Sequence, residues 1–336
     1  MRGLISRIWK PLLGSAISLF LLYLVFHQVD FRRFITALRE AHYLYLIPVI
    51  GIMYGNIALR AIRWDYLLRP VKRARFGSLI GTTFVGFMAN NLLPARMGDV
   101  IKGYLLGRTE RISKTSSFAT IVVEKLFDAV TVLGFLVILF LTLRNLQVYP
   151  AFKKALKVGG YVSLGIFLTT LLVLFMIKER IEVFLRFLSW VLRPFSSGLS
   201  ERGKEHVYSF REGLLSAERW DYLAMALFYS FLTWSTYALS IHITCLAFGI
   251  RLPLSASFLA MVAICLGTVL PFTPGFIGTY HAAITYSLLL YQVPLEKAAG
   301  VSLVFHASYF LPTTFTGLLY IWHYKLSLKK IKEEVA

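Results

Sequence analysis

The sequence predicts an all-α membrane protein, a polytopic helical bundle with two broken or re-entrant helical units. Its mean hydropathy of +0.66 and its 57% share of hydrophobic residues exceed the average of soluble domains. Apolar runs long enough to cross about 30 Å of hydrocarbon recur along the whole chain. Two of these runs are interrupted by polar residues, proline and glycine. We therefore treat residues 1–336 as a single transmembrane domain.

The first two apolar runs, at about 11–28 and 42–60, each predict one membrane-spanning helix. Basic residues gather on the cytoplasmic side of membrane proteins, and they flank both runs. Before the first run these are Arg2, Arg7 and Lys10, and after the second they are Arg60, Arg63, Arg69, Lys72, Arg73 and Arg75. We therefore expect a cytoplasmic N-terminus and an external 29–41 link. Because no small-residue cleavage site follows the first run, we interpret it as an uncleaved helix.

The first predicted re-entrant unit covers about 76–108. Its apolar part stops at Asn90 and Asn91, and the polar stretch that follows cannot cross a membrane alone. Broken backbone at membrane depth is tolerated only inside protein or beside a wet cavity, because lipid cannot satisfy its polar groups. The break therefore indicates a site.

The middle of the chain predicts a span at 119–143 and a return at 158–177. Four polar residues then follow at spacings of four, three and four, which predicts an amphipathic helix at about 180–195 on the cytoplasmic interface. These residues are Glu182, Arg186, Ser189 and Arg193. A polar connector is expected at 199–219.

The last part of the chain predicts a span at 221–249, a second interrupted unit at about 254–291 and a final span at 297–323. The second unit is either a re-entrant hairpin or two spans, and both return the chain to the same side. Lysines after 323 then place the C-terminus in the cytoplasm. The two units would enter from opposite sides, as interrupted helices do in transporters with inverted repeats.

The segment from Asn90 to Lys102 has the composition of an anion site. Pro94 ends the preceding helix, Gly98 permits a tight turn, and Asp99 is expected to N-cap a short helix that ends near Gly107. A helix N-terminus beside Arg96 and Lys102 would attract phosphate. The alternative is an ordinary cytoplasmic loop with positive-inside charges.

Two carboxylates enter the membrane in the segment Glu124-Lys125-Leu126-Phe127-Asp128. Glu124 and Asp128 are four residues apart and share one helix face. Carboxylates in lipid are costly unless they are paired, and Arg96, Lys102 or Lys125 would be the partners. The carboxylates would either form a charge clasp or contact substrate.

The second break is centred on Pro271, Pro274, Gly275 and Gly278. Thr279, Tyr280 and His281 follow it at the start of a helix. His281 is either a headgroup ligand or proton carrier, or a hydrogen-bonded packing residue.

The composition excludes several classes of protein. The 36 Lys and Arg against 17 Asp and Glu give a formal net charge of +19. The basic residues lie between apolar runs, so anionic lipid headgroups and not nucleic acid explain them. No Walker A loop, GxSxG elbow, HExxH or CxxC occurs, so we assign no cofactor, metal or catalytic residue.

Three elements resemble a flippase-like family of integral membrane proteins that includes the transmembrane region of lysylphosphatidylglycerol synthases. The first, Asn-x-x-Pro-x-Arg-x-Gly-Glu/Asp-x-x-Arg/Lys, is matched by Asn91, Pro94, Arg96, Gly98, Asp99 and Lys102. The second, Glu-Arg-x-x-Asp, is matched by Glu124, Lys125 and Asp128. The third, Pro-x-x-Pro-Gly-Gly-x-Gly-x-x-Glu, is matched by Pro271, Pro274, Gly275, Gly278 and His281. Lys125, Phe276 and His281 depart from the usual arginine, glycine and glutamate.

The resemblance implies a translocase for an anionic phospholipid or a polyprenyl-phosphate-linked lipid in the cytoplasmic membrane. We expect the phosphate or headgroup to be bound by Asn91, Arg96, Lys102, Thr279, Tyr280 and His281. Asp99, Glu124, Lys125 and Asp128 would form the clasp or couple transport. The rival functions are an intramembrane enzyme or accessory subunit of lipid aminoacylation or glycosylation, and a lipid-binding scaffold. Expected partners are membrane lipids, a second copy of the chain or a lipid-modifying enzyme.

Overall fold

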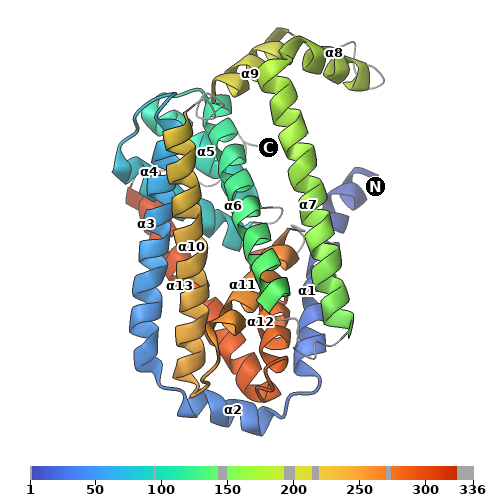
Figure 1. The fold of residues 1–336 in the computed structure, drawn as a ribbon, viewed down its shortest axis with the longest axis vertical. Helices are drawn as coiled ribbons and strands as arrows, with labels where there is room; N and C mark the ends of the chain where they lie inside the picture. Colours follow the sequence, from blue (N-terminus) through green and yellow to red (C-terminus); the bar gives the residue numbers. More distant parts are fainter. Residues whose placement is uncertain are drawn as a thin grey trace.

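The computed structural model describes residues 2–93, 96–142, 150–192, 201–213, 219–269 and 274–323. Within these ranges every regular element is a helix, which confirms the predicted all-α fold (Figure 1). By length and composition, two helical segments can cross a membrane, Tyr43–Leu68 and Lys157–Glu179. The pair Gly14–Phe26 and Phe31–Glu40, bent by 87°, counts as a third span if it is taken as one.

The longest helices run along the length of the bundle (Figure 1). They are α1 (Arg2–Phe26), α3 (Leu46–Leu68), α6 (Lys114–Thr142), α7 (Pro150–Glu179), α10 (Trp220–Ala247) and α13 (Leu295–His323). At 1.5 Å per residue, the 28 residues of α10 extend about 42 Å, more than the hydrocarbon thickness of a bilayer. We call the end where α3 stops the basic end, because Arg69, Lys72 and Arg73 follow there. The opposite end is the α2 end.

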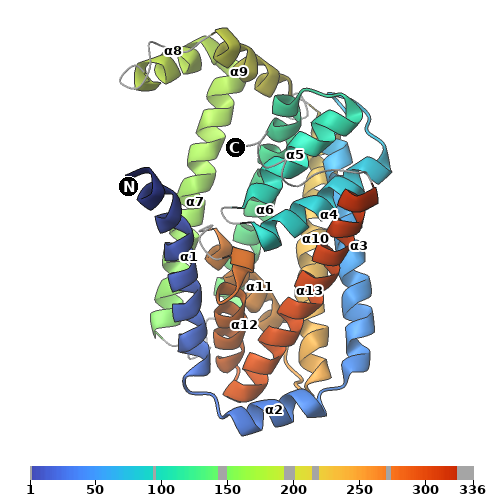
Figure 2. The ribbon, with the colours of Figure 1, turned by 180° about the vertical axis from the view of Figure 1, so that it is seen from behind.

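The first broken unit forms a hairpin that enters from the basic end. Helix α4 (Phe76–Leu92) descends to about mid-height, and α5 (Met97–Glu110) returns (Figure 2). The two helices approach closely because both carry glycine: a Cβ on Gly98 would lie 1.9 Å from the Gly86 carbonyl oxygen. The Gly98 N–H also donates to Asn90 Oδ1 at 2.9 Å. Residues 94–95, with Pro94, lie outside the described residues.

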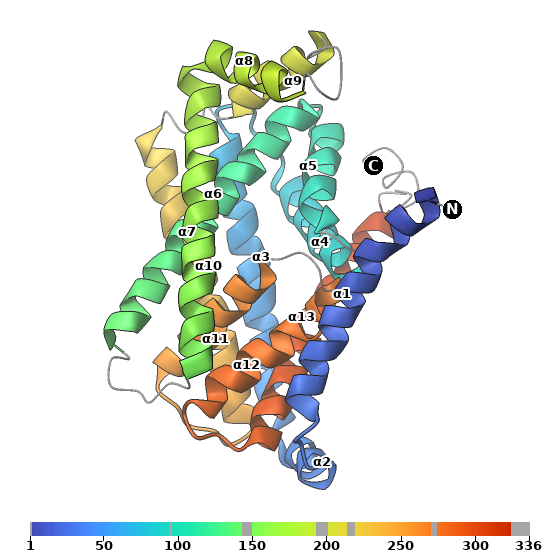
Figure 3. The ribbon, with the colours of Figure 1, turned by 90° about the vertical axis from the view of Figure 1, so that its right-hand side faces the viewer.

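The second broken unit forms a hairpin that enters from the α2 end (Figure 3). Helix α11 (Leu254–Thr268) rises, the 3₁₀ turn η3 (Pro274–Phe276) follows, and α12 (Thr279–Leu289) returns. With 15 and 11 residues these helices are too short for two full spans, so the unit is re-entrant. Gly278 has φ 85°, and a Cβ there would lie 2.6 Å from the Ser18 carbonyl oxygen of α1. Pro271 and its neighbours at 270–273 lie outside the described residues.

The α2 end is covered by a short helix, which occupies most of the predicted 29–41 link. Helix α2 (Phe31–Glu40) begins after Asp30, whose side chain accepts hydrogen bonds from the Arg32 and Arg33 N–H groups. Its apolar face buries Phe34 against Ala299 of α13. After η1 (Tyr43–Tyr45) the chain enters α3.

Two short helices lie at the basic end beyond α7 (Figure 1). Helix α8 (Ile181–Leu192) falls within the predicted 180–195 amphipathic helix, whose last residues lie outside the described ranges. Helix α9 (Glu201–Gly213) occupies part of the expected 199–219 connector. The place of α8 at a membrane surface stays a prediction.

Candidate functional site

The two hairpins meet inside the bundle, where described residues beside each break pack against protein. Asn91, near the end of α4, donates from Nδ2 to Thr313 Oγ1 at 3.1 Å and to Thr314 Oγ1 at 2.9 Å, which fixes this tip on α13. A Cβ on Gly275 of the other tip would lie only 3.0 Å from the Asn91 carbonyl oxygen. This enclosure is the condition under which irregular backbone is stable at membrane depth.

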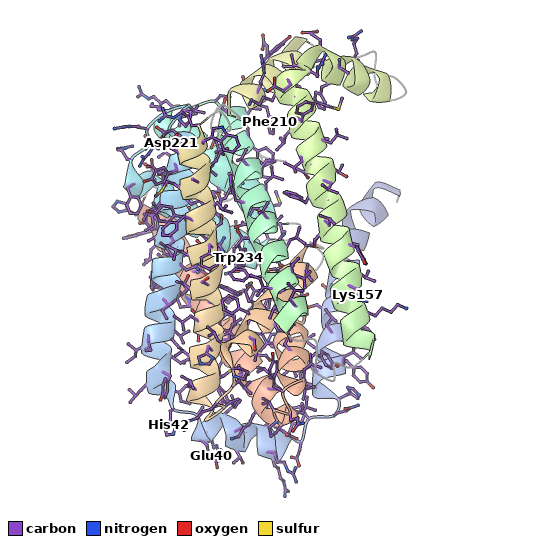
Figure 4. All side chains as sticks on the ribbon, in the orientation of Figure 1. Glu40, His42, Lys157, Phe210, Asp221 and Trp234 are labelled. Atoms are coloured by element: carbon purple, nitrogen blue, oxygen red, sulfur yellow. The ribbon has the colours of Figure 1, made fainter. Side chains whose placement is uncertain are left out.

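A cavity of about 500 Å³ lies beside the meeting point. Among the described residues, nine helices contribute to its wall: α3, α4, α5, α6, α7, α10, α11, α12 and α13. The charged residues that line it are Arg60, Arg96, Asp99, Lys102, Glu124, Lys125 and Asp128. Figure 4 shows Trp234, another lining residue, about halfway along α10. The site therefore combines charged side chains with an interior position.

Arg63 forms the centre of the ion-pair network behind this cavity. Its guanidinium has no exposed surface. Nη2 donates to Glu124 Oε1 at 2.7 Å, and Nη1 donates to Asp128 Oδ1 and to Ser230 Oγ, both at 2.6 Å. The planar fork of arginine suits this arrangement, because one side chain can satisfy two carboxylates at once.

Two lysines complete the network. Lys102 donates to Glu124 Oε2 at 2.8 Å, and its Nζ lies 4.0 Å from the centre of the Trp64 ring. Lys125 pairs with Asp99 at 3.1 Å. The predicted charge clasp therefore includes a residue that was not expected in it. Arg63 pairs with both Glu124 and Asp128.

Arg60 and Arg63 were assigned to the cytoplasmic flank of the second helix, and this assignment is wrong. Helix α3 continues to Leu68, and both side chains point into the protein. The signal that could have found them is spacing: Asn56, Arg60 and Arg63 are four and three residues apart and share a helix face. Arg60 Nε donates to Asn56 Oδ1 at 3.0 Å, which links two of them directly.

Arg60 faces the cavity with little compensation. Its nearest carboxylate is Asp128, at 4.0 Å from Nη1, and its guanidinium lies 5.0 Å from the ring centre of Trp234 and 5.4 Å from that of Phe87. A cation between two aromatic faces is held in position electrostatically while it remains open to a further anion.

Arg96 is the cation at the tip of the first hairpin. It precedes α5 with φ 53°, in the left-handed region, and its guanidinium lies 5.4 Å from the centre of the Phe276 ring of the second hairpin. No carboxylate lies within 4.0 Å of Arg96 among the residues that the structure describes. The prediction that Asp99 N-caps this helix is wrong, because α5 begins at Met97 and contains Asp99 in its first turn. The helix also ends at Glu110 and not near Gly107.

Two histidines hold the second tip. His281 is buried, and its Nδ1 accepts a hydrogen bond from the Gly278 N–H at 3.2 Å. His306 Nε2 donates to the Gly275 carbonyl at 3.0 Å, and the two rings lie 5.1 Å apart. His281 occupies the third position of α12, where a side chain that accepts from the preceding backbone stabilises a helix start.

The predicted headgroup residues divide into two groups. Asn91, Arg96, Lys102 and Tyr280 line the cavity, whereas Thr279 and His281 are buried at the start of α12 and do not line it. Their role as headgroup ligands stays a prediction. In the described part of the chain, no group of three His, Cys, Asp or Glu side chains is arranged as metal ligands would be.

The fold and the site define a class: a polytopic helical membrane protein in which two opposed re-entrant hairpins meet at a charged internal cavity. The chain belongs to the family described as the lysylphosphatidylglycerol synthase TM region, which it matches over residues 12–317. This confirms the resemblance of the three sequence elements.

Curated relatives agree with this membership. A UPF0104 membrane protein of Pyrococcus horikoshii is 25% identical over 334 residues, covering 94% of this chain and 98% of its own length. A UPF0104 membrane protein of Methanocaldococcus jannaschii is 25% identical over 253 residues, covering 73% of this chain and 98% of its own. Glycosyltransferase AglD of Haloferax volcanii is 23% identical across all of this chain, which spans 58% of AglD.

Proposed function

We propose that this protein moves an anionic phospholipid or a polyprenyl-phosphate-linked lipid across the cytoplasmic membrane. The observation that carries the proposal is Arg96, a cation without a carboxylate partner in the described residues, at the tip where two opposed hairpins enclose a cavity. A phosphate in a site of low dielectric needs such a cation, because burial of an unpaired anion is costly.

The charge balance of the cavity favours an anion. The basic residues in and behind it are Arg60, Arg63, Arg96, Lys102 and Lys125, and the carboxylates are Asp99, Glu124 and Asp128. Arg63 and Lys102 already neutralise Glu124, so Arg60 and Arg96 are the side chains left for a ligand. The N-terminus of α5, which follows Arg96, adds a favourable dipole.

The opposed hairpins supply a route for the headgroup. One hairpin reaches the cavity from the basic end and the other from the α2 end, so a small movement of either tip would open the site to its own side. Under the positive-inside rule the basic end is cytoplasmic, with both termini on that side. Phosphate binding to Arg60 and Arg96, followed by alternate opening of the tips, is the proposed mechanism.

The test is lipid movement in reconstituted liposomes. Purified protein is placed in phosphatidylcholine vesicles that contain headgroup-labelled phosphatidylglycerol, and the fraction of label open to an external quencher is followed in time. Arg96→Ala should slow the movement at least about tenfold, equivalent to about 1.4 kcal/mol. Arg108→Ala is the matched control, because Arg108 is exposed on the same helix. Equal rates for wild type and Arg96→Ala would contradict the proposal.

A second function is favoured by one observation. The relative AglD bears the name glycosyltransferase and contains a region similar to this whole chain. The chain would then act as an intramembrane enzyme, or as the accessory membrane part of a lipid-modifying enzyme, with Glu124 or Asp128 as acid or base. Mass spectrometry of the lipids after incubation distinguishes the two functions, because only the enzyme yields a lipid of altered mass.

A further inference from the structure

A second hollow lies between α6 and α7, and its lining is apolar. Its volume is also about 500 Å³, and its wall includes Val162, Val173, Leu174 and Ile177 of α7. No charged side chain contributes to it. The Thr170 hydroxyl donates to the Ile166 carbonyl at 2.8 Å, so this polar group is already satisfied within its own helix.

This groove adjoins the charged cavity. Val122 of α6, with Ile166 and Thr170 of α7, lines both. The α7 residues of the groove, 162–177, all fall within the segment Lys157–Glu179, which is apolar enough to span a membrane and is largely unburied. The groove therefore lies beside the cavity, on a helix whose outer surroundings in a membrane would be hydrocarbon.

The position of the groove can be followed in Figure 4. Phe210 of α9 marks its limit at the basic end, where α9 crosses beside α6 and α7, and Lys157 lies near the other end of α7. On the same helix Leu168 is 54% exposed and lines neither hollow, whereas Ile166 is 50% exposed and lines both. Leu168 and Ile166 are thus about equally exposed and differ in whether they line the groove, which makes Leu168 a matched control position.

We propose that the α6–α7 groove holds a hydrocarbon chain of the lipid whose phosphate lies beside Arg96. This inference rests on the proposed function for the identity of the headgroup. A lipid in transit must keep its phosphate near cations and its chain out of contact with charges, since each part is unstable in the environment of the other. The cavity and the groove meet these two requirements side by side, with Val122, Ile166 and Thr170 at their junction.

The direct test uses phosphatidylglycerol with a photoactivatable diazirine in one acyl chain, added to phosphatidylcholine vesicles that contain the wild-type protein. After illumination, crosslinked residues are located by mass spectrometry. Groove residues such as Ile166 should be labelled at least about threefold more than Leu168, since a bound chain stays while bulk lipid exchanges. Arg96→Ala should reduce labelling in the groove and leave labelling at Leu168 unchanged.

A blocking variant tests the same inference through transport. Thr170→Trp fills the junction, and Leu168→Trp adds the same side chain to the outward face as a control. Thr170→Trp should slow movement of labelled phosphatidylglycerol about tenfold while inorganic phosphate still binds the detergent-solubilised protein. Leu168→Trp should match the wild type.

The outcomes separate this inference from the proposed function. Equal labelling of Ile166 and Leu168, or transport at the wild-type rate by folded Thr170→Trp, would contradict the proposed role of the groove. Neither result would contradict lipid translocation. Selective labelling of the groove by a protein that moves no lipid would support the groove and overturn translocation. A changed oligomeric state in Thr170→Trp, together with groove residues of the wild type that take no more label than Leu168, would assign the groove to a second copy of the chain and overturn the inference.

Discussion

The Arg63 guanidinium lies 2.7 Å from the Glu124 carboxylate, and neither side chain is more than 3% exposed. This pair joins α3 to α6 across 61 residues of sequence. The same arginine also pairs with Asp128, so a single side chain contacts both acidic groups that α6 carries into the membrane. The network forms part of the cavity wall beside the two hairpin tips.

Replacement of Arg63 should therefore destabilise the fold. Arg63→Ala leaves two buried carboxylates without their shared partner, and loss of one member of a buried ion pair costs about 3–5 kcal/mol. We expect a large fall in the midpoint of thermal unfolding in detergent. Arg69→Ala, which removes a partly exposed partner of Asp65, should cost about 1 kcal/mol or less. Equal effects of the two variants would contradict the central position of Arg63.

The contact between Gly86 and Gly98 should tolerate no side chain. Gly98→Ala places a Cβ against the Gly86 carbonyl, which forces α4 and α5 apart at a cost of at least about 2 kcal/mol and displaces Arg96. Gly134→Ala on α6 is the matched control, because no atom lies within 4 Å of the added Cβ. It should be neutral or stabilise the helix by about 1 kcal/mol. Thermal unfolding and phosphate affinity of both variants check this prediction.

The His281 ring should act through its acceptor nitrogen. His281→Gln keeps a side chain that can accept from the Gly278 N–H, so its stability should remain close to that of the wild type. His281→Ala loses this acceptor and should cost about 1 kcal/mol. If lipid movement fell equally in both variants while stability was unchanged in both, His281 would instead contact the headgroup.

Both membrane breaks could be predicted from the sequence. Asn90 and Asn91 end one apolar run, and the glycines at 275 and 278 interrupt another. Such interruptions leave backbone polar groups that lipid cannot satisfy, so the chain must turn back inside protein. The hairpins α4–α5 and α11–α12 fulfil this prediction, and they enter from opposite ends as expected.

The ion-pair network could be predicted only in part. The carboxylates of α6 were found because charges inside an apolar run need partners, but their partner Arg63 is more than 60 residues away and resembles an ordinary flanking charge. The position of Arg63 depends on where α3 ends, and no local signal marks that end. The helix extends eight residues beyond Arg60, so Arg63 lies inside it. Similarly, the residue type of Arg96 does not predict its left-handed backbone. This conformation places the start of α5 before Asp99.

A pH dependence is expected at the basic end, outside the spans. Burial alone raises the pKa of Glu110, but hydrogen bonds from Ser78 and Arg75 hold it below its ordinary value of 4.5. A carboxyl whose pKa is lower in the folded state stabilises the protein above its unfolded pKa and loses this effect as pH falls through the folded pKa. The difference in unfolding midpoint between wild type and Glu110→Gln should therefore be constant from pH 7 down to the ordinary pKa and shrink below it. A difference that grew on acidification would contradict this assignment.

The most direct test of the central claim compares headgroup charge in one preparation. Liposomes with wild-type protein receive either labelled phosphatidylglycerol, which is anionic, or labelled phosphatidylcholine, which is zwitterionic. If Arg60 and Arg96 bind the phosphate of an anionic lipid, phosphatidylglycerol should cross at least about tenfold faster, and Arg60→Ala should reduce this preference. Equal rates for the two lipids, or a preference that survives loss of both arginines, would contradict the account.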